Sequence, residues 1–356
     1  MRSKEAVIKR APLAGCLILT FLAACDNVSW GGADVTIVPP PPKASGAPEP
    51  GVEPGSERLP QGPVLYHVAV SDGGGRIAPI AEISGDSLRA VRPIRDPKSW
   101  GEAFIERNLE PGSEFVLFHE GVRVGTLIAQ SAVVDASGCR PLPVGTGSLE
   151  LGQSAAGIRE FLALAKAQAP QIQRRNDTPL APTRTMRVLA PILADRMLRS
   201  RNSPLPGNWE RALAQLQPFP VPGTSDQAFT ATFLVGDTLG PGLDDAGQAL
   251  FFVALPAAMG YDTAFVEFRN YSATGKSAPA VFDFLDWNAD DVPDLLLRVQ
   301  GVNDAWYEAI GLRNGRWRVL FSDRCERPIA EPPATDTTAP ARPTTTTTAP
   351  PDTSRG

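Results

Sequence analysis

Hydrophobic and polar residues alternate over the first third of the chain with the period of two that a half-buried β-strand requires. Residues 64–70 follow this pattern up to a glycine-rich turn. Residues 114–119 and 122–134 form two more strand-like runs, and only the dipeptide Glu120-Gly121 separates them. We therefore expect a β-hairpin at this point of the sequence.

The middle of the chain changes to a helical period. Apolar residues recur at the spacing i, i+3, i+4 and i+7 over 158–165, which predicts a helix. A second helix is expected to begin near Pro191, because the fixed φ of proline suits a first helical turn. A third is expected over 209–216, with Asn208 as its cap.

From residue 226 onward the sequence returns to short strand-like runs without helical crossovers between them. These runs are 230–235, 249–255, 263–269, 280–285, 295–300, 305–312 and 317–321. Asn314-Gly315 separates the last two, and both residues tolerate the positive φ of a type I′ turn. The pattern predicts an α+β, β-rich fold with an antiparallel β region, a short helical middle section and a second antiparallel β meander, either a sandwich or an open barrel.

The first 24 residues have the composition of a secretory signal. A charged start precedes the uncharged run 11–24, whose 14 residues are too few for an ordinary transmembrane helix. The run ends in Leu22-Ala23-Ala24-Cys25, which resembles the lipobox of bacterial lipoproteins. The resemblance implies cleavage before Cys25 and attachment of a diacylglyceryl group to its sulfur; a plain secretory signal is the alternative. Cys16 follows a similar motif, but no apolar core precedes it.

A lipidated Cys25 would hold the protein to a membrane without crossing it. Each buried methylene contributes about 0.8 kcal/mol, so two or three acyl chains anchor a protein stably. We therefore expect a lipid-anchored protein of the bacterial cell envelope, on the extracytoplasmic side of a membrane. Asp26 resembles the inner-membrane retention signal of enteric bacteria, but other bacteria sort lipoproteins differently, so inner versus outer membrane stays open.

Charge and cysteine usage narrow the partners and the compartment. The net charge of the chain is −5, and removal of residues 1–24, with four basic residues and one acidic residue, leaves −8. Such an acidic chain is a poor nucleic-acid binder, and we expect no nucleic-acid partner. Cys139 and Cys325 remain once Cys16 and Cys25 are accounted for. In an oxidising envelope we expect them to form a disulfide, with two separate buried thiols as the alternative.

Proline-rich composition marks both ends of the mature chain. Residues 25–62 are expected to be a disordered tether that begins with the lipidated cysteine, and 328–356 a disordered Thr/Pro-rich tail. Between them we expect three parts, a β-rich subdomain at 63–150, a helical segment at 151–225 and an antiparallel β subdomain at 226–327.

An acidic loop is the strongest candidate for a metal site. The stretch from Asp286 to Asp294 places four carboxylates and one carboxamide within nine residues. With Asp286 as position 1, Asn288, Asp290 and Asp294 fall at positions 3, 5 and 9, a spacing that can wrap oxygen ligands around one calcium ion. The loop resembles the Asp/Asn-rich loops of FG-GAP and VCBS-type repeats, which join two β-strands. The resemblance implies a calcium site, but as a single copy it does not imply a propeller.

Two residues depart from calcium-loop patterns. Position 6 is Asp291, where such loops prefer glycine, and position 12 is Leu297, where an EF-hand has a bidentate glutamate. Calcium binding is therefore weighed against an exposed acidic turn, in which Asp and Asn side chains bond to their own backbone.

Recognisable catalytic motifs are missing from the sequence. His67 and His119 have no metal-binding spacing, and no Gly-x-Ser-x-Gly elbow occurs. Gly275-Lys276-Ser277 has the form of the end of a phosphate loop, but Asn270 stands in place of the required glycine and a strand is expected to follow. We therefore assign no catalytic residue.

Arginines are concentrated in the predicted helical segment. Residues 174–201 contain seven arginines and two aspartates, a net charge of +5. Such a surface suits anionic headgroups or an acidic envelope partner. The alternative is a solvated helix face whose arginines pair with acids of the β regions.

These features predict a membrane-anchored, extracytoplasmic lipoprotein whose β-rich part is a non-catalytic binding or structural module. Two alternatives stay open. One is a calcium-dependent adhesion module that uses the acidic loop, and the other is an envelope hydrolase whose site carries no recognisable motif.

Overall fold

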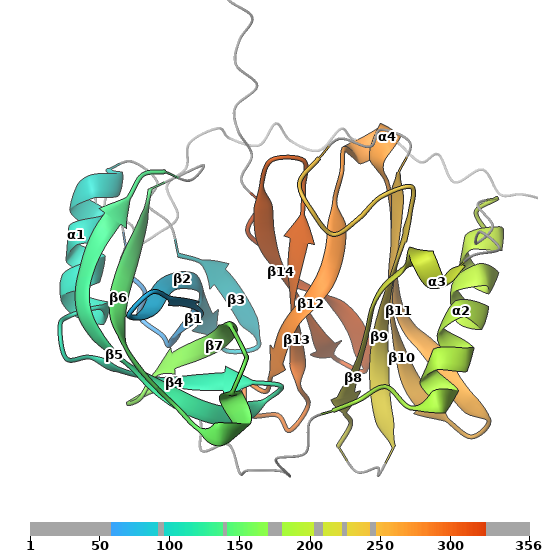
Figure 1. Cartoon of the computed structure of the whole chain (residues 1–356), viewed down its shortest axis with the longest axis horizontal. Helices are drawn as coiled ribbons and strands as arrows, with labels where there is room; N and C mark the ends of the chain where they lie inside the picture. Colours follow the sequence, from blue (N-terminus) through green and yellow to red (C-terminus); the bar gives the residue numbers. More distant parts are fainter. Residues whose placement is uncertain are drawn as a thin grey trace, which may run out of the picture. The chain divides into compact units, whose positions relative to one another are not determined.

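The computed structural model describes residues 58–91, 96–137, 141–169, 180–202, 209–222, 226–242 and 247–324. Cys25, Cys139 and Cys325 lie outside these residues, as do the predicted signal segment, the predicted Thr/Pro-rich tail and nearly all of the predicted tether. The described residues form three antiparallel sheets with few helices (Figure 1). The predicted β-rich α+β fold is confirmed.

Within the described residues, the first sheet has seven strands: β1 (Val64–Ser71), β2 (Gly74–Ser84), β3 (Ser87–Ala90), β4 (Glu114–His119), β5 (Val122–Asp135), β6 (Leu142–Leu151) and β7 (Glu160–Ala165). Their order is β1-β7-β4-β5-β6-β2-β3, and β1 also pairs with β2. Six strands therefore close into a barrel, and β3 extends the sheet beside β2. Helix α1 (Pro97–Asn108) packs against β5 and β6, and the 3-10 turn η1 (Gln153–Ala155) precedes β7.

Strand β1 contributes side chains to two different cores. Val64 and Tyr66 belong to a core that the barrel strands share with α1. Leu65, on the opposite face, packs in a second core with Leu162 of β7 and Leu296 of the third sheet. Because successive side chains of a strand point to opposite faces, both faces of β1 are covered by apolar groups.

The second sheet contains β8 (Leu213–Pro220), β9 (Gln227–Val235), β10 (Gln248–Ala257) and β11 (Gly260–Asn270), in the order β11-β10-β9-β8. Helix α2 (Arg184–Arg199) covers one face of this sheet (Figure 1), and the short helix α3 (Trp209–Ala212) leads into β8. Met186 and Ala190 of α2 pack there against Phe229 and Phe252.

The third sheet contains β12 (Ala278–Leu285), β13 (Asp294–Gln300), β14 (Ala305–Arg313) and β15 (Arg316–Ser322), in sequence order, and the short helix α4 (Tyr271–Thr274) precedes it. Phe251 and Val253 of β10 share a core with Leu295 and Ile310 of this sheet. The second and third sheets therefore pack together through this core, which matches the sandwich form of the predicted β meander.

The two predicted hairpin turns are confirmed. Glu120 and Gly121, with φ of 51° and 71°, join β4 to β5. Asn314 and Gly315, with φ of 53° and 71°, join β14 to β15. Both dipeptides adopt the positive φ values that a two-residue type I′ turn requires.

The predicted helix over 158–165 is wrong. Residues 160–165 form strand β7, in which Phe161 belongs to the barrel core and Leu162 to the second core. The sequence of a strand that is buried on both faces is a continuous run of apolar residues. Such a run also satisfies the helical spacing, so periodicity alone does not separate the two structures.

Helix α2 begins earlier than predicted. Its first residue is Arg184, and Pro191 lies buried inside the helix. The start is set by Thr183, whose side chain accepts a hydrogen bond from the backbone N–H of Met186.

Helix α3 is shorter than the predicted helix over 209–216. It ends at Ala212, and from Leu213 the chain pairs with β9 as strand β8. From Leu213 onward, the backbone N–H and C=O groups form hydrogen bonds with β9. A helix that continued to residue 216 would lose these bonds between strands. Asn208, the predicted cap, lies outside the described residues.

Candidate functional site

A polar cleft of about 450 Å³ lies where strand β7 of the barrel meets strands β12 and β13 of the third sheet. Charged and apolar side chains share its walls, among them His119, Arg159, Glu160, Phe282, Arg298 and Gln300. Two separate sheets supply these residues, so the cleft depends on their packing.

Arg298 connects the two sheets across this cleft. Its Nη1 and Nη2 atoms donate hydrogen bonds to Oε2 and Oε1 of Glu160 at 2.9 and 2.7 Å. Nη2 also donates to the Tyr307 hydroxyl at 3.1 Å, and the guanidinium carbon lies 4.8 Å from the centre of the Phe282 ring. A guanidinium held by a two-pronged ion pair and an aromatic face keeps one orientation.

The ionisation of this network follows from its contacts. The hydrogen bonds from Arg298 lower the pKa of Glu160. Burial, together with the positive charge of Arg298, lowers the pKa of His67 to about 4. His67 Nε2 lies 3.1 Å from Oε1 of Glu160 and 3.4 Å from Nη2 of Arg298. At neutral pH, Glu160 is therefore ionised and His67 is uncharged.

His119 lies in a different electrostatic environment. The tight turn after β4 brings its Nδ1 to 3.6 Å from Oδ2 of Asp283, a fully buried carboxylate. The other oxygen of Asp283 accepts the backbone N–H of Glu120 at 2.8 Å. The interaction between the His119 imidazole and the Asp283 carboxylate raises the pKa of His119. The imidazolium form of His119 therefore persists to a higher pH than in a free histidine.

No protein-family model, curated protein or solved structure matches the chain.

The acidic loop joins β12 to β13, as its flanking strands predicted. Asp286 accepts hydrogen bonds from the backbone N–H groups of Asp290 and Asp291 at 3.1 and 2.9 Å. Asp290 accepts bonds from the Val292 backbone and the Asn288 side chain, both at 2.9 Å. Asp291 has a φ of 65°, the conformation for which calcium loops prefer glycine. This is the bonding of a turn that satisfies its own backbone.

Asp294, the fourth predicted calcium ligand, is bound by an arginine. Its carboxylate is buried and accepts hydrogen bonds from Arg313 at 2.8 and 3.1 Å. In the described part of the chain, no three His, Cys, Asp or Glu side chains are grouped so as to hold a metal ion. The geometry favours the acidic-turn alternative over calcium binding by Asp286, Asn288, Asp290 and Asp294.

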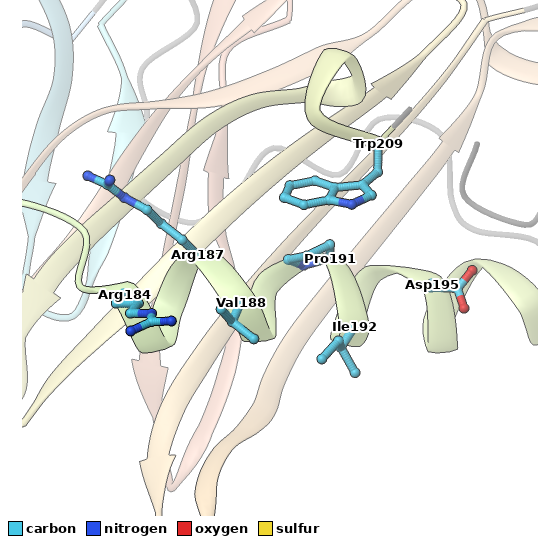
Figure 2. Close-up of a pocket in the computed structure, with 7 residues that line it drawn as sticks. All are labelled: Arg184, Arg187, Val188, Pro191, Ile192, Asp195 and Trp209. Carbon is cyan, nitrogen blue, oxygen red and sulfur yellow. The ribbon is translucent and has the colours of Figure 1, made fainter. Parts of the chain in front are cut away.

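A second surface feature lies along helix α2. A groove of about 620 Å³ separates the helix from Trp209, whose ring lies over Pro191 (Figure 2). Val188 and Ile192 line it although they are 53% and 51% exposed. The charged residues along the groove are Arg184, Arg187 and Asp195.

The structure places only part of the arginine-rich segment. Arg174 and Arg175 lie outside the described residues. Arg199 pairs with Asp195 of the same helix at 2.6 Å, and the Arg201 guanidinium lies 5.4 Å from the centre of the Phe268 ring. Arg199 and Arg201 are therefore held by these contacts and not by the ion pairs with acids of the β regions that the alternative predicted.

The predicted membrane anchor and disulfide fall on residues that the structure does not describe. Cys25, Cys139 and Cys325 are outside the described ranges, so acylation and the Cys139–Cys325 bond stay predictions. Among the described helices, none combines the length and the apolar composition needed to cross a bilayer.

Proposed function

We propose that this chain is a lipoprotein anchored on the extracytoplasmic side of a bacterial membrane, and that its β-rich part is a non-catalytic binding or structural module. The observation that carries the proposal is Leu22-Ala23-Ala24-Cys25 at the end of the uncharged run 11–24. A peptidase that cuts before the cysteine accepts an aliphatic residue and two small residues in narrow pockets. Acyl chains on Cys25 then hold the rest of the chain at the bilayer surface.

The ionisation of the Glu160–Arg298–His67 network supports binding over catalysis. His119, which lines the same cleft and whose pKa is raised by Asp283, is the residue that keeps the envelope-hydrolase alternative open. A general acid or base works best when its pKa lies near the ambient pH. The pKa of Glu160 is lowered by Arg298, and the pKa of His67 is lowered to about 4, so neither group exchanges protons near neutrality. The same contacts fix the Arg298 guanidinium before any ligand arrives. A preorganised group loses less entropy on binding, which favours a recognition role.

Metabolic labelling with radioactive palmitate tests the anchor. We expect the label on the native protein and on a Cys16→Ser variant, and no label on a Cys25→Ser variant. Each substitution removes one thiol from the first 25 residues, so the pair separates acylation at Cys25 from any general effect on export. Label retained by Cys25→Ser, or a soluble protein that keeps residues 1–24, would contradict the proposal. Mass spectrometry of the same sample tests the Cys139–Cys325 bond.

A further inference from the structure

Helix α2 carries apolar side chains on both of its sides. Its inner side buries Met186, Ala190 and Leu198 against the second sheet. That burial accounts for the stability of the helix, and it leaves no packing role for Val188 and Ile192, which are 53% and 51% exposed. Residues four apart lie next to each other on a helix, so these two form one apolar patch.

Arginines border this patch. Arg184 and Arg187 line the same groove, and Arg196 is exposed one turn beyond it. Asp195 also lines the groove, where its carboxylate pairs with Arg199. Among the described residues, none of Arg184, Arg187 and Arg196 forms an ion pair with a carboxylate. The surface therefore combines unneutralised positive charge with exposed aliphatic groups, on a chain whose net charge is −5.

An aromatic side chain completes the groove. The Trp209 ring lies over Pro191 and lines the same groove (Figure 2), and it also packs against the core beneath the helix. Tryptophan, arginine and branched aliphatic residues are the combination that settles at the boundary between headgroups and acyl chains. An acidic protein partner would satisfy the arginines, but it would not require an aliphatic patch at the centre of the charged surface.

We propose that the outer face of α2, formed by Arg184, Arg187, Val188, Ile192 and Trp209, docks on anionic lipid headgroups of the membrane that holds Cys25. This inference rests on the proposed lipid anchor, which keeps the helix close to a bilayer. About 30 residues separate Cys25 from the described part of the chain, enough to reach on the order of 100 Å when extended. A tether of this length allows helix α2 to reach the membrane surface. The arginines and the aliphatic patch determine which face of the helix contacts the headgroups.

Vesicle sedimentation measures the affinity of this face without the anchor. The protein used is the mature chain from residue 25 with Cys25→Ser, so that neither the signal segment nor an acyl chain contributes. The vesicles are pure phosphatidylcholine or phosphatidylcholine with one third phosphatidylglycerol. We expect binding only to the anionic vesicles, and weaker binding at high salt, because salt screens exposed charges.

Two double variants divide the surface into its parts. Arg184→Gln with Arg187→Gln is expected to lower the partition coefficient about 30-fold, since each basic residue near an anionic surface contributes about fivefold. Val188→Ser with Ile192→Ser is expected to weaken binding at high salt as well as at low salt, because the lost contribution is apolar. The matched control is Arg107→Gln with Arg123→Gln, two exposed arginines on α1 and β5 with the same change in net charge. All variants replace exposed residues, and equal melting temperatures check that they fold.

The outcomes separate this inference from the proposed function. If the native protein carries palmitate on Cys25 but the mature Cys25→Ser chain does not bind anionic vesicles, the docking surface is overturned and the anchor is left intact. Equal losses in the Arg184/Arg187 and Arg107/Arg123 variants would also overturn it, because general charge would then explain the binding. Vesicle binding that depends on Arg184 and Arg187, in a protein without palmitate, would support the surface and refute the anchor.

Discussion

Replacing Lys276 by methionine is expected to destabilise the fold strongly, because Lys276 closes a buried ion pair. Its Nζ donates to Oδ1 of Asp237 at 2.7 Å and to the backbone carbonyls of Thr238 and Gly240 at 3.1 and 2.5 Å. The two charged side chains are 2% and 6% exposed. All three hydrogens of the ammonium group are therefore satisfied, and the loop after β9 is fastened to the start of β12.

The expected loss in the free energy of unfolding is about 3–5 kcal/mol, the range for removing one partner of a buried ion pair. Methionine occupies a similar volume, so most of the loss comes from the Asp237 carboxylate that stays behind. Its Oδ2 atom has no hydrogen-bond partner among the described residues, and the variant leaves Oδ1 without the ammonium. At about 2–4 °C per kcal/mol, the melting temperature should fall by roughly 10 °C.

Urea unfolding followed by circular dichroism measures this loss. Lys98→Met, at an exposed position of α1, is the matched control and should change the free energy of unfolding by less than about 0.5 kcal/mol. Lys276→Met combined with Asp237→Leu removes both charges and should recover much of the stability, since the unpaired carboxylate is gone. A single variant within about 1 kcal/mol of the native protein, or a double variant no more stable than the single, would refute the reasoning.

Two further predictions concern pH and calcium. Because the pKa of His67 falls from 6.5 in a free histidine to about 4 in the fold, the unfolded chain takes up a proton before the folded one does. Stability should therefore decrease as the pH falls from about 6.5 to about 4, by at most about 3 kcal/mol from this residue, and less steeply in a His67→Gln variant; an equal slope in both proteins would count against it. For the acidic loop, calorimetry should show no heat with calcium and a chelator should leave the melting temperature unchanged. A site of about 0.1 to 1 mM affinity would instead add about 2.7 kcal/mol at 100 times its Kd.

Elements whose signal is local were predictable from the sequence. Asn314-Gly315 and Glu120-Gly121 specify their turns by their own conformational freedom, and both turns occur as expected. Strands β2 and β6 were not predicted, because their glycines resemble those of loops. The structure explains these glycines: a Cβ at Gly74 would collide with the backbone of Gly147, and one at Gly147 with the backbone of Ile128. Neighbouring strands lie so close at these positions that only glycine fits. The β-branched and aromatic residues that would indicate a strand in the sequence are therefore missing there.

The polar cleft was not predictable, because its parts are distant in sequence. Glu160 and Arg298 are separated by 138 positions, and only the packing of the barrel against the third sheet brings them together. One local signal existed. Arg298 interrupts the apolar run 295–299, and a charge within a buried strand needs a partner. Lys276 gave a similar signal within a tripeptide that resembled a phosphate loop, and its partner is Asp237.

The incorrect helix over 158–165 and the position of the cleft have the same physical origin. Residues 161–164 of β7 are all buried, because the barrel core covers one face of the strand and the second core covers the other. A charged side chain can therefore stand on this strand only where the two cores end. Glu160 is the first residue of β7, at that limit, and there it meets Arg298. The apolar run 161–164, whose spacing also fits a helix, thus leaves room for a charged side chain only at the start of β7. The cleft opens at this end of the strand.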